Sequence, residues 1–156
     1  MNVRIRKMRV GDAGALADLW LEMVLYHAKC DPYWRVKRNS KGGYAEYMRG
    51  MLGAPDKIVY VAHEDGEIVG FVLALLDKRS RVFRQAGVGG IQDLAVTAKW
   101  RRKGIGRRLV RKVWGWFEEK GVRTVEVRAA TANPLATAFW KSMGFEEYMA
   151  MCRKKV

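Results

Sequence analysis

The chain has 156 residues, of which 49% are hydrophobic and 29% are charged, and its formal net charge at pH 7 is +14. This length predicts a single domain over residues 1–156, with enough apolar residues for a buried core that needs no disulfide bonds. No apolar run approaches the ~20 residues of a membrane-spanning helix, so no segment is expected to cross a membrane. The excess of positive charge favours an anionic partner, such as nucleic acid or a polyphosphate ligand, or a charged surface that contacts only water.

Hydrophobic periodicity divides the first half of the chain into a strand, two helices and a β-hairpin. Residues 3–9 alternate charged and apolar side chains, which is typical of a strand and not of a signal peptide. Asp12 follows in a position to cap the next helix. The dipeptide Asp65-Gly66 between two apolar runs predicts a tight turn. The expected elements are a strand over 3–9, a helix that ends near Cys30, a helix over 41–52, and strands over 58–63 and 68–76.

The second half begins with a stretch over 77–90, which we expect to be a loop because it is polar. A strand, a helix and another strand follow, which is the pattern of a crossover between parallel strands. Asn133 and Pro134 predict the start of a short helix, and Gly144 predicts its end. The expected elements are strands over 90–97 and 123–130, helices over 105–120 and 133–144, and a last strand over 145–155.

The stretch RRKGIG, residues 101–106, lies between the expected strand and the helix of this crossover. The first N–H groups of a helix have no partner within it, and with the helix dipole they form an anion site. Gly104 and Gly106 would let a phosphate approach the backbone. A P-loop needs Gly-Lys-Ser/Thr and a dinucleotide fingerprint needs a third glycine, but Arg107 and Leu109 stand at those positions. The pattern that remains is R-x-x-G-x-G, which matches a pyrophosphate in length.

In its context this pattern resembles the GCN5-related N-acetyltransferase (GNAT) family, whose acetyl-CoA loop reads Q/R-x-x-G-x-G/A. The preceding IQDLAV, residues 91–96, is similar to the strand before that loop. The later NPLATAFWKSMGF, residues 133–145, resembles the family's asparagine helix, and the hairpin with DGEIVGFV is also typical. The resemblance implies an α/β (α+β) GNAT fold over residues 1–156, with a central mixed, mostly antiparallel sheet flanked by about four helices.

The resemblance also implies an acetyl-CoA-dependent N-acetyltransferase that passes an acetyl group directly to a primary amine on a small molecule, a protein N-terminus or a lysine. CoA would be the product, and no metal is expected. In the family, the strand before the loop diverges from the next parallel strand, and the pantetheine arm pairs with the exposed backbone. The implied cofactor-binding residues are Leu94, Ala95, Val96, Arg101, Arg102, Lys103, Gly104, Ile105, Gly106, Arg107, Asn133 and Trp140.

Transfer to an amine calls for a base that takes the amine proton, and it can use an acid for the leaving thiolate. Asp93 matches an acidic position of some GNAT members, and Glu126 resembles the catalytic glutamate of the branch that acetylates protein N-termini. For both carboxylates, an ion pair with one of the many lysines and arginines is the alternative. Trp140 replaces the usual tyrosine acid, and an indole does not give up a proton at neutral pH. Tyr148 is the nearest tyrosine in the sequence, with ordinary packing or a reaction without an acid as alternatives.

Two other classes of protein stay open. The first is a GNAT-fold protein that binds acyl-CoA as a sensor without catalysis, which Trp140 favours. The second is a basic nucleic-acid-binding module, which interleaves cations with exposed aromatic residues. That module is disfavoured by an apolar stripe that a helix would bury, namely Leu109, Val110, Val113, Trp114 and Phe117.

The acceptor amine is expected to enter between three segments, over residues 26–35, 79–84 and 146–149. Tyr33, Trp34 and Phe83 are candidates for an aromatic wall there, with anchoring of surface loops as the alternative. Cys30 and Cys152 fit no metal or redox spacing, which favours a reducing cytoplasm. A homodimer is compatible with the sequence.

Overall fold

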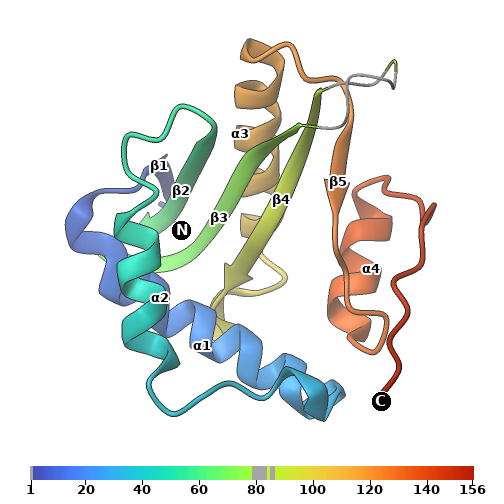
Figure 1. Ribbon diagram of the computed structural model, residues 1–156. Helices are drawn as coiled ribbons and strands as arrows, with labels where there is room; N and C mark the ends of the chain where they lie inside the picture. The colour runs from blue at the N-terminus through green and yellow to red at the C-terminus, as the bar shows by residue number, and fades with distance from the viewer. Residues whose placement is uncertain (1, 79–83, 85–86) are drawn as a thin grey trace.

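The computed structural model describes residues 2–78, 84 and 87–156, and Figure 1 shows how they are arranged. Their strands form one sheet in the order β1-β2-β3-β4-β5. Strands β1 to β4 are antiparallel to their neighbours, and β5 runs parallel to β4, so the expected mixed sheet is confirmed. The strands are β1 (Arg4–Lys7), β2 (Lys57–Glu64), β3 (Glu67–Lys78), β4 (Gly87–Val96) and β5 (Val125–Val127).

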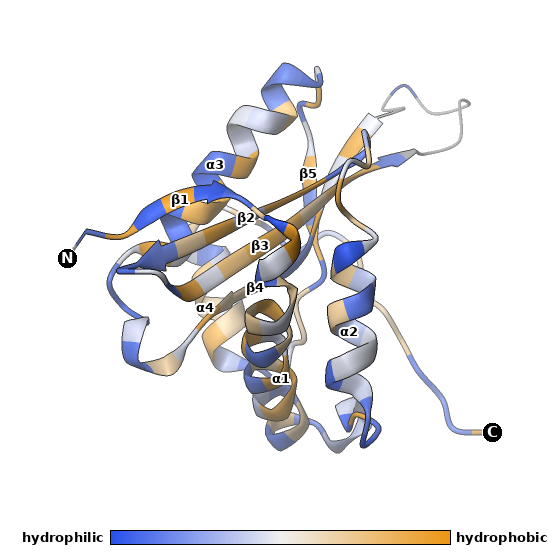
Figure 2. Cartoon of the chain, turned by 90° about the vertical axis from the view of Figure 1, so that its left-hand side faces the viewer, coloured by the Kyte–Doolittle hydropathy of each residue, from blue (hydrophilic) through white to orange (hydrophobic). Residues whose placement is uncertain are grey.

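Helices pack on both faces of this sheet. Helices α1 (Ala13–Cys30) and α2 (Ser40–Arg49) cover one face, and α3 (Ile105–Glu119) covers the other face, where α4 (Pro134–Ser142) also packs. Figure 2 shows α2 and α3 on opposite sides of the strands. No helix of the described residues combines the length and the apolar character that a membrane span requires.

The central strand β3 is buried on both faces because its side chains alternate between two cores. Phe71 and Leu73 belong to the core under α1 and α2, while Val72 and Ala74 belong to the core under α3. All four are fully buried. Burial of each of the larger side chains contributes roughly 1.5–3 kcal/mol, so β3 fixes both helical layers on the sheet.

The apolar stripe predicted for α3 is buried except for Trp114, which is half-buried. Leu109, Val110, Val113 and Phe117 are at most 1% exposed, and Trp116 is more deeply buried than Trp114. These aromatic rings therefore lie in the core under α3. They are not available to stack on nucleic-acid bases, which removes the main support for a nucleic-acid-binding module.

The prediction of a loop over 77–90 is wrong at both ends of that range. Strand β3 continues to Lys78, and β4 already begins at Gly87, with these two residues paired. A Cβ atom on Gly89 would lie 2.5 Å from the Phe117 ring, so this glycine lets α3 pack closely on the sheet. Gly89 thus has a packing function within a strand. Phe83, expected in the acceptor wall, lies outside the described residues.

The strand expected over 145–155 is also wrong. The described residues after α4 include no strand, and residues 146–156 are all exposed. Side-chain alternation alone does not provide an edge to pair with, and β5 is three residues long instead of the expected eight. The segment is attached through side chains instead, because Arg153 pairs with Asp31 at 2.9 Å and stacks on the Tyr33 ring.

Asp12 does not cap α1 in the expected way. It stands at the N-cap position, but its side chain makes no capping bond. Its two carboxylate oxygens accept hydrogen bonds from the Arg6 guanidinium at 2.6 and 2.9 Å, and the Arg9 N–H also donates to it. The Arg6 bond lowers the pKa of Asp12. Asp12 therefore joins β1 to the start of α1.

Candidate active site

Strand β5 pairs with only a short part of β4, from Gly89 to Ile91. The last pair is Ile91 with Val127, after which β4 continues to Val96 against β3 alone, and Figure 1 shows the two strands diverging. Just beyond that pair, the register with β3 shifts and Gln92 is the extra residue of a β-bulge. We refer to residues 93–96, which have β3 on one side and no strand on the other, as the open edge of β4.

Two residues present their backbone groups along the open edge of β4. The Thr97 N–H donates to the Val69 carbonyl in β3 at 3.0 Å. Backbone groups alternate in direction along an antiparallel strand. The N–H and C=O groups of Ala95 therefore point to β3, while those of Leu94 and Val96 point to the side without a strand. The Val96 carbonyl accordingly accepts a hydrogen bond from Arg101 Nε at 2.8 Å. Of the three residues expected to pair with a pantetheine arm, two thus turn their backbone groups to the side without a strand.

The loop before α3 has the geometry of an anion site. Gly104 precedes the helix with a left-handed φ of 77°, and the first bond of the helix runs from the Arg108 N–H to the Gly104 carbonyl. The N–H groups of residues 105–107 therefore lie in a first turn that offers them no carbonyl. Gly106 has a different reason to be glycine, since a Cβ atom there would lie 3.2 Å from the Phe139 ring. Gly106 therefore has a packing function, and its predicted contact with a phosphate, like that of Gly104, stays a prediction.

Arg101 is engaged elsewhere and does not point to an anion at this loop. Its Nη2 atom pairs with Glu22 Oε1 of α1 at 2.9 Å, while its Nε atom bonds the Val96 carbonyl. The same Glu22 oxygen accepts the Ala98 N–H at 2.9 Å. Arg101 and Glu22 therefore fasten α1 to the end of β4, and the cofactor-binding role expected for Arg101 stays a prediction.

The other cations near the loop divide into two groups. Arg102 and Lys103 are exposed at the loop, where the Lys103 ammonium lies 4.5 Å from the centre of the Trp100 ring. Arg107 lies 3.4 Å from the Ser142 carbonyl oxygen. Farther along α3, Arg108 donates to the Val3 carbonyl at 2.7 Å and Lys112 lies over the Tyr60 ring. The first group can surround a bound phosphate, and the second group holds α3 against the sheet.

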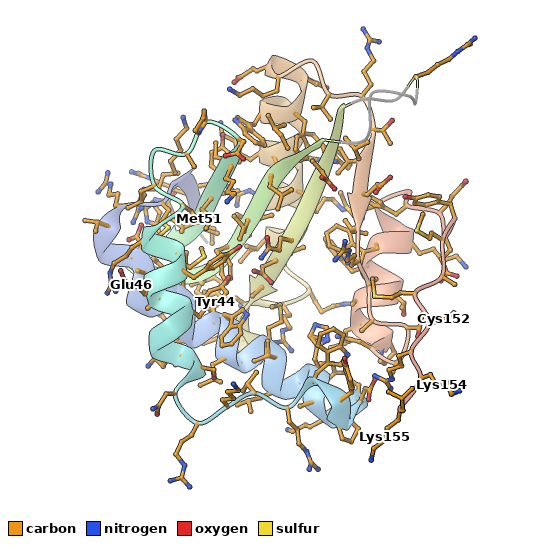
Figure 3. The ribbon with its side chains drawn as sticks, viewed as in Figure 1. Tyr44, Glu46, Met51, Cys152, Lys154 and Lys155 are labelled. Carbon is orange, nitrogen blue, oxygen red and sulfur yellow. The ribbon has the colours of Figure 1, made fainter. Side chains whose placement is uncertain are left out.

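Asp93 lies on the face of the sheet that carries α1 and α2, in a partly buried position. The Tyr44 hydroxyl donates to Asp93 Oδ2 at 2.9 Å, and the Tyr44 ring stacks on Trp20 at 4.4 Å. Figure 3 shows Tyr44 on the side of α2 that faces the sheet. Burial raises the pKa of Asp93, and the bond from Tyr44 opposes this rise. Burial and the Asp93 charge raise the pKa of Tyr44 far above its usual value, so Tyr44 stays a neutral donor. The partner of Asp93 is thus a phenol and not the lysine or arginine of the alternative interpretation.

Glu126 and Tyr148 are brought together on the same face. Val125 and Val127 of β5 pack against the core under α3, so Glu126 between them faces the other side, as Asp93 does. The Tyr148 hydroxyl donates to Glu126 Oε1 at 2.6 Å. Tyr148 therefore lies beside a catalytic candidate, although it stands on the exposed C-terminal segment and not on a strand.

Asn133 is 5% exposed and caps α4 as expected. Its Oδ1 atom accepts the N–H groups of Leu135 and Ala136, both at 3.1 Å. Its Nδ2 atom lies 3.1 Å from His27 Nδ1 of α1. The sequence analysis missed His27, although His27 continues the inward spacing of Leu16, Trp20 and Met23 by one further turn.

Trp140 packs into an aromatic cluster on the α3 side of the sheet. Its ring meets Phe139 and Phe145 edge to face, with centroid distances of 5.0 and 5.2 Å. All three rings pack against the core under α3. Trp140 therefore contributes to the packing of α4, on the face opposite to the side chains of Asp93 and Glu126.

Comparison with known proteins shows which family has this arrangement. The model of the acetyltransferase (GNAT) family matches residues 20–145. The chain belongs to the GNAT acetyltransferase family. An uncharacterized N-acetyltransferase of Archaeoglobus fulgidus is 32% identical over 140 residues, which are 90% of each chain. N-alpha-acetyltransferase 30 of Xenopus laevis is 33% identical over 89 residues, 57% of this chain.

The GNAT domain is part of a longer protein in some of these relatives. The matched region covers 44% of an N-acetyltransferase of Methanocaldococcus jannaschii and 32% of the Xenopus protein. Among solved structures, the BH1408 protein of Bacillus halodurans has a TM-score of 0.87 at 20% identity, with 98% of this chain covered. The aminoglycoside N-acetyltransferase AAC(6')-Iy in complex with CoA has a TM-score of 0.77 at 18% identity, with 99% covered. These two likenesses establish the GNAT fold.

Proposed function

We propose that this chain transfers an acetyl group from acetyl-CoA to a primary amine. The observation that carries the proposal is the open edge of β4, where Leu94 and Val96 turn backbone groups outward, directly before the anion site at α3. The amide groups of a pantetheine arm can pair with such an edge as a strand would. Membership of the GNAT family and the CoA complex of AAC(6')-Iy, a protein of the same fold, support this cofactor.

The pyrophosphate would be held mainly by backbone. The N–H groups of residues 105–107 and the dipole of α3 supply the attraction. Ile105 contributes only its backbone, because its side chain is 1% exposed and belongs to the core. Arg102, Lys103 and Arg107 add positive charge around the same turn. Part of the net charge of the chain thereby has a function in cofactor binding.

Asp93 is proposed as the general base. An amine arrives at neutral pH as an ammonium ion, and it must lose a proton before its nitrogen can attack the thioester carbonyl. A carboxylate whose pKa is raised by burial accepts that proton more readily than an ordinary aspartate. Tyr44 holds one carboxylate oxygen, which orients the other oxygen for the amine. Glu126, on the same face, adds negative charge that attracts the ammonium ion.

The cofactor supplies the acetyl group as a thioester, from which the amine nitrogen displaces the thiolate. The N–H groups of Leu94 and Val96 are directed to the side where negative charge develops on the carbonyl oxygen. Tyr148 donates to Glu126 and so positions that carboxylate. A thiol of pKa ~8.5 is a good leaving group, so the proposal needs no general acid.

Two measurements test this function. At acetyl-CoA concentrations of about 100 times Kd, ligand binding stabilises the protein by roughly 2.7 kcal/mol, which raises Tm by roughly 5–10 °C. CoA release is then followed with a panel of peptides, polyamines and aminoglycosides, and an amine-dependent rate supports the enzyme. Stabilisation without release by any amine would favour the acyl-CoA sensor, for which the packed Trp140 is the supporting observation. No stabilisation would contradict both functions.

A further inference from the structure

We infer that His27 is a positioning residue, which orients the Asn133 amide towards the pantetheine arm of the cofactor. The inference rests on the proposed function. It starts from a hydrogen bond between residues 106 positions apart in the sequence, which joins the last part of α1 to the N-cap residue of α4. Figure 1 shows these two segments next to each other below the diverging ends of β4 and β5.

The hydrogen-bond partners determine which atoms face each other. Asn133 Oδ1 accepts two backbone N–H groups, so the amide is fixed with its Nδ2 atom towards His27. An amide nitrogen can only donate, so His27 Nδ1 must accept. His27 is therefore neutral, with its proton on Nε2. In the inferred arrangement, the second hydrogen of Asn133 Nδ2 donates to a carbonyl group of the cofactor.

Helix α1 contacts both sides of the site. Glu22, in the middle of α1, accepts from the Ala98 N–H and from Arg101 at the end of β4. His27, five residues later, contacts the start of α4. The two contacts fix the position of α4 relative to the open edge of β4. His27 thus sets both the direction of the Asn133 amide and its distance from that edge.

Protonation of His27 would break this arrangement, since an imidazolium has N–H groups at both nitrogens and accepts no hydrogen bond. Burial lowers the pKa of His27, so the bond persists until the pH falls below the usual range of histidine. The charged groups at this end of α1 are Lys29, which is exposed, and Asp31 and Arg153, which pair with each other. The nearest charged group on the preceding turns is Glu22, which is paired with Arg101.

Three single variants test the inference through the Kd of acetyl-CoA at pH 7.5. His27→Leu removes the acceptor, and we expect about tenfold weaker binding from the loss of one positioning hydrogen bond. His27→Asn keeps an acceptor oxygen near the place of Nδ1, and we expect a Kd within about threefold of wild type. His63→Leu changes the other histidine, which lies on β2, and should leave Kd unchanged. A wild-type Kd for His27→Leu overturns the inference.

Two further readouts separate positioning from simple stability. The first uses Asn133→Ser, which keeps a capping oxygen but removes the amide donors. In that background His27→Leu should weaken binding less than about twofold further, because the coupled partner is already gone. If His27→Leu weakens binding of acetyl-CoA by the same factor in the Asn133→Ser background as in the wild type, the inference is overturned. The second is pH, since the wild-type Kd should begin to rise only below pH ~6.5, the usual pKa of histidine, while the Kd of His27→Asn should not rise there.

Nitrogen NMR of the ligand-free protein tests the contact without any activity. The imidazole of His27 should show its proton on Nε2 at pH 7.5, with the His63→Leu variant used for assignment. A proton on Nδ1 would overturn the inference even if acetyl-CoA binds. If the wild-type protein binds no acetyl-CoA, the proposed function fails, and the NMR result still decides the His27–Asn133 contact.

Discussion

The two faces of β4 carry different kinds of functional groups. On the α3 side, the residues proposed to bind a phosphate are consecutive, and they would act mainly through backbone N–H groups at the start of a helix. On the α1 and α2 side, the polar groups are side-chain pairs from distant segments, namely Tyr44 with Asp93 and Tyr148 with Glu126. The first face should tolerate many side-chain substitutions, whereas single substitutions should disable the second.

The largest effect is expected from Asp93→Asn, which keeps the shape of the side chain and removes the base. Loss of a general base costs typically 10²–10⁴-fold in rate, so kcat/KM should fall by at least about 100-fold while the Kd of acetyl-CoA stays the same. Glu46→Gln is the matched control, because Glu46 lies on the outer side of α2, as Figure 3 shows. Retention of activity by Asp93→Asn, with loss in Glu126→Gln, would transfer the base to Glu126.

The same variant should also change the pH dependence of stability. The pKa of Asp93 is raised in the folded protein, so the folded state binds its proton more tightly than the unfolded chain. Stability of the wild type therefore falls as pH rises from the unfolded pKa towards the folded pKa. Asp93→Asn lacks this loss, so its Tm relative to wild type should increase between pH 4 and pH 7. A constant difference in Tm would show that Asp93 carries no burial cost.

A smaller effect is expected on the α3 side from Gly104→Val. A left-handed φ costs an L-residue roughly 1–2 kcal/mol, and a β-branched side chain is at the upper end of that range. Because no atom lies within 4 Å of a Cβ at this position, the cost comes from the backbone and not from a collision. Acetyl-CoA binding should weaken by about tenfold. Gly104→Asn, which tolerates this conformation, should bind nearly as wild type, and equal losses in both variants would contradict the argument.

Tyr44→Phe should have a modest effect that depends on pH. The ring keeps its stack on Trp20, but the hydrogen bond that opposes the rise in the pKa of Asp93 is lost. The pKa of Asp93 should rise further, so the acid limb of the kcat/KM profile should move to higher pH. Activity should fall several-fold at pH 7 and recover at pH 9. A loss that is equal at both pH values would instead indicate a packing defect.

The smallest effect is expected from Arg153→Ala in the C-terminal segment. Arg153 forms an ion pair with Asp31, and its own side chain is 58% exposed. Exposed ion pairs contribute roughly 0–1 kcal/mol to stability. The midpoint of urea unfolding should therefore change little. A large loss of stability would show that this segment holds the fold together, against its exposed position.

The sequence predicted best what short segments determine by themselves. The Asp65-Gly66 turn, the stripe of α3 and the loop 101–106 are local patterns, and each has the expected structure. Gly89 and Gly106 have a second function that only the fold reveals, because the rings that need their space come from distant helices. The expected last strand was wrong because alternation does not show whether a sheet edge is free. The His27–Asn133 contact depends on how α1 crosses the sheet, which no local pattern records.

The central claim is that acetyl-CoA lies along the open edge of β4 and on the first turn of α3. Amide hydrogen exchange measured residue by residue, with and without acetyl-CoA, tests it most directly. The ligand should slow exchange of the N–H groups of Leu94 and Val96 and of residues 105–107, whereas β2, across β3 from this edge, should not change. Unchanged exchange at Leu94 and Val96 in the saturated protein would contradict the account.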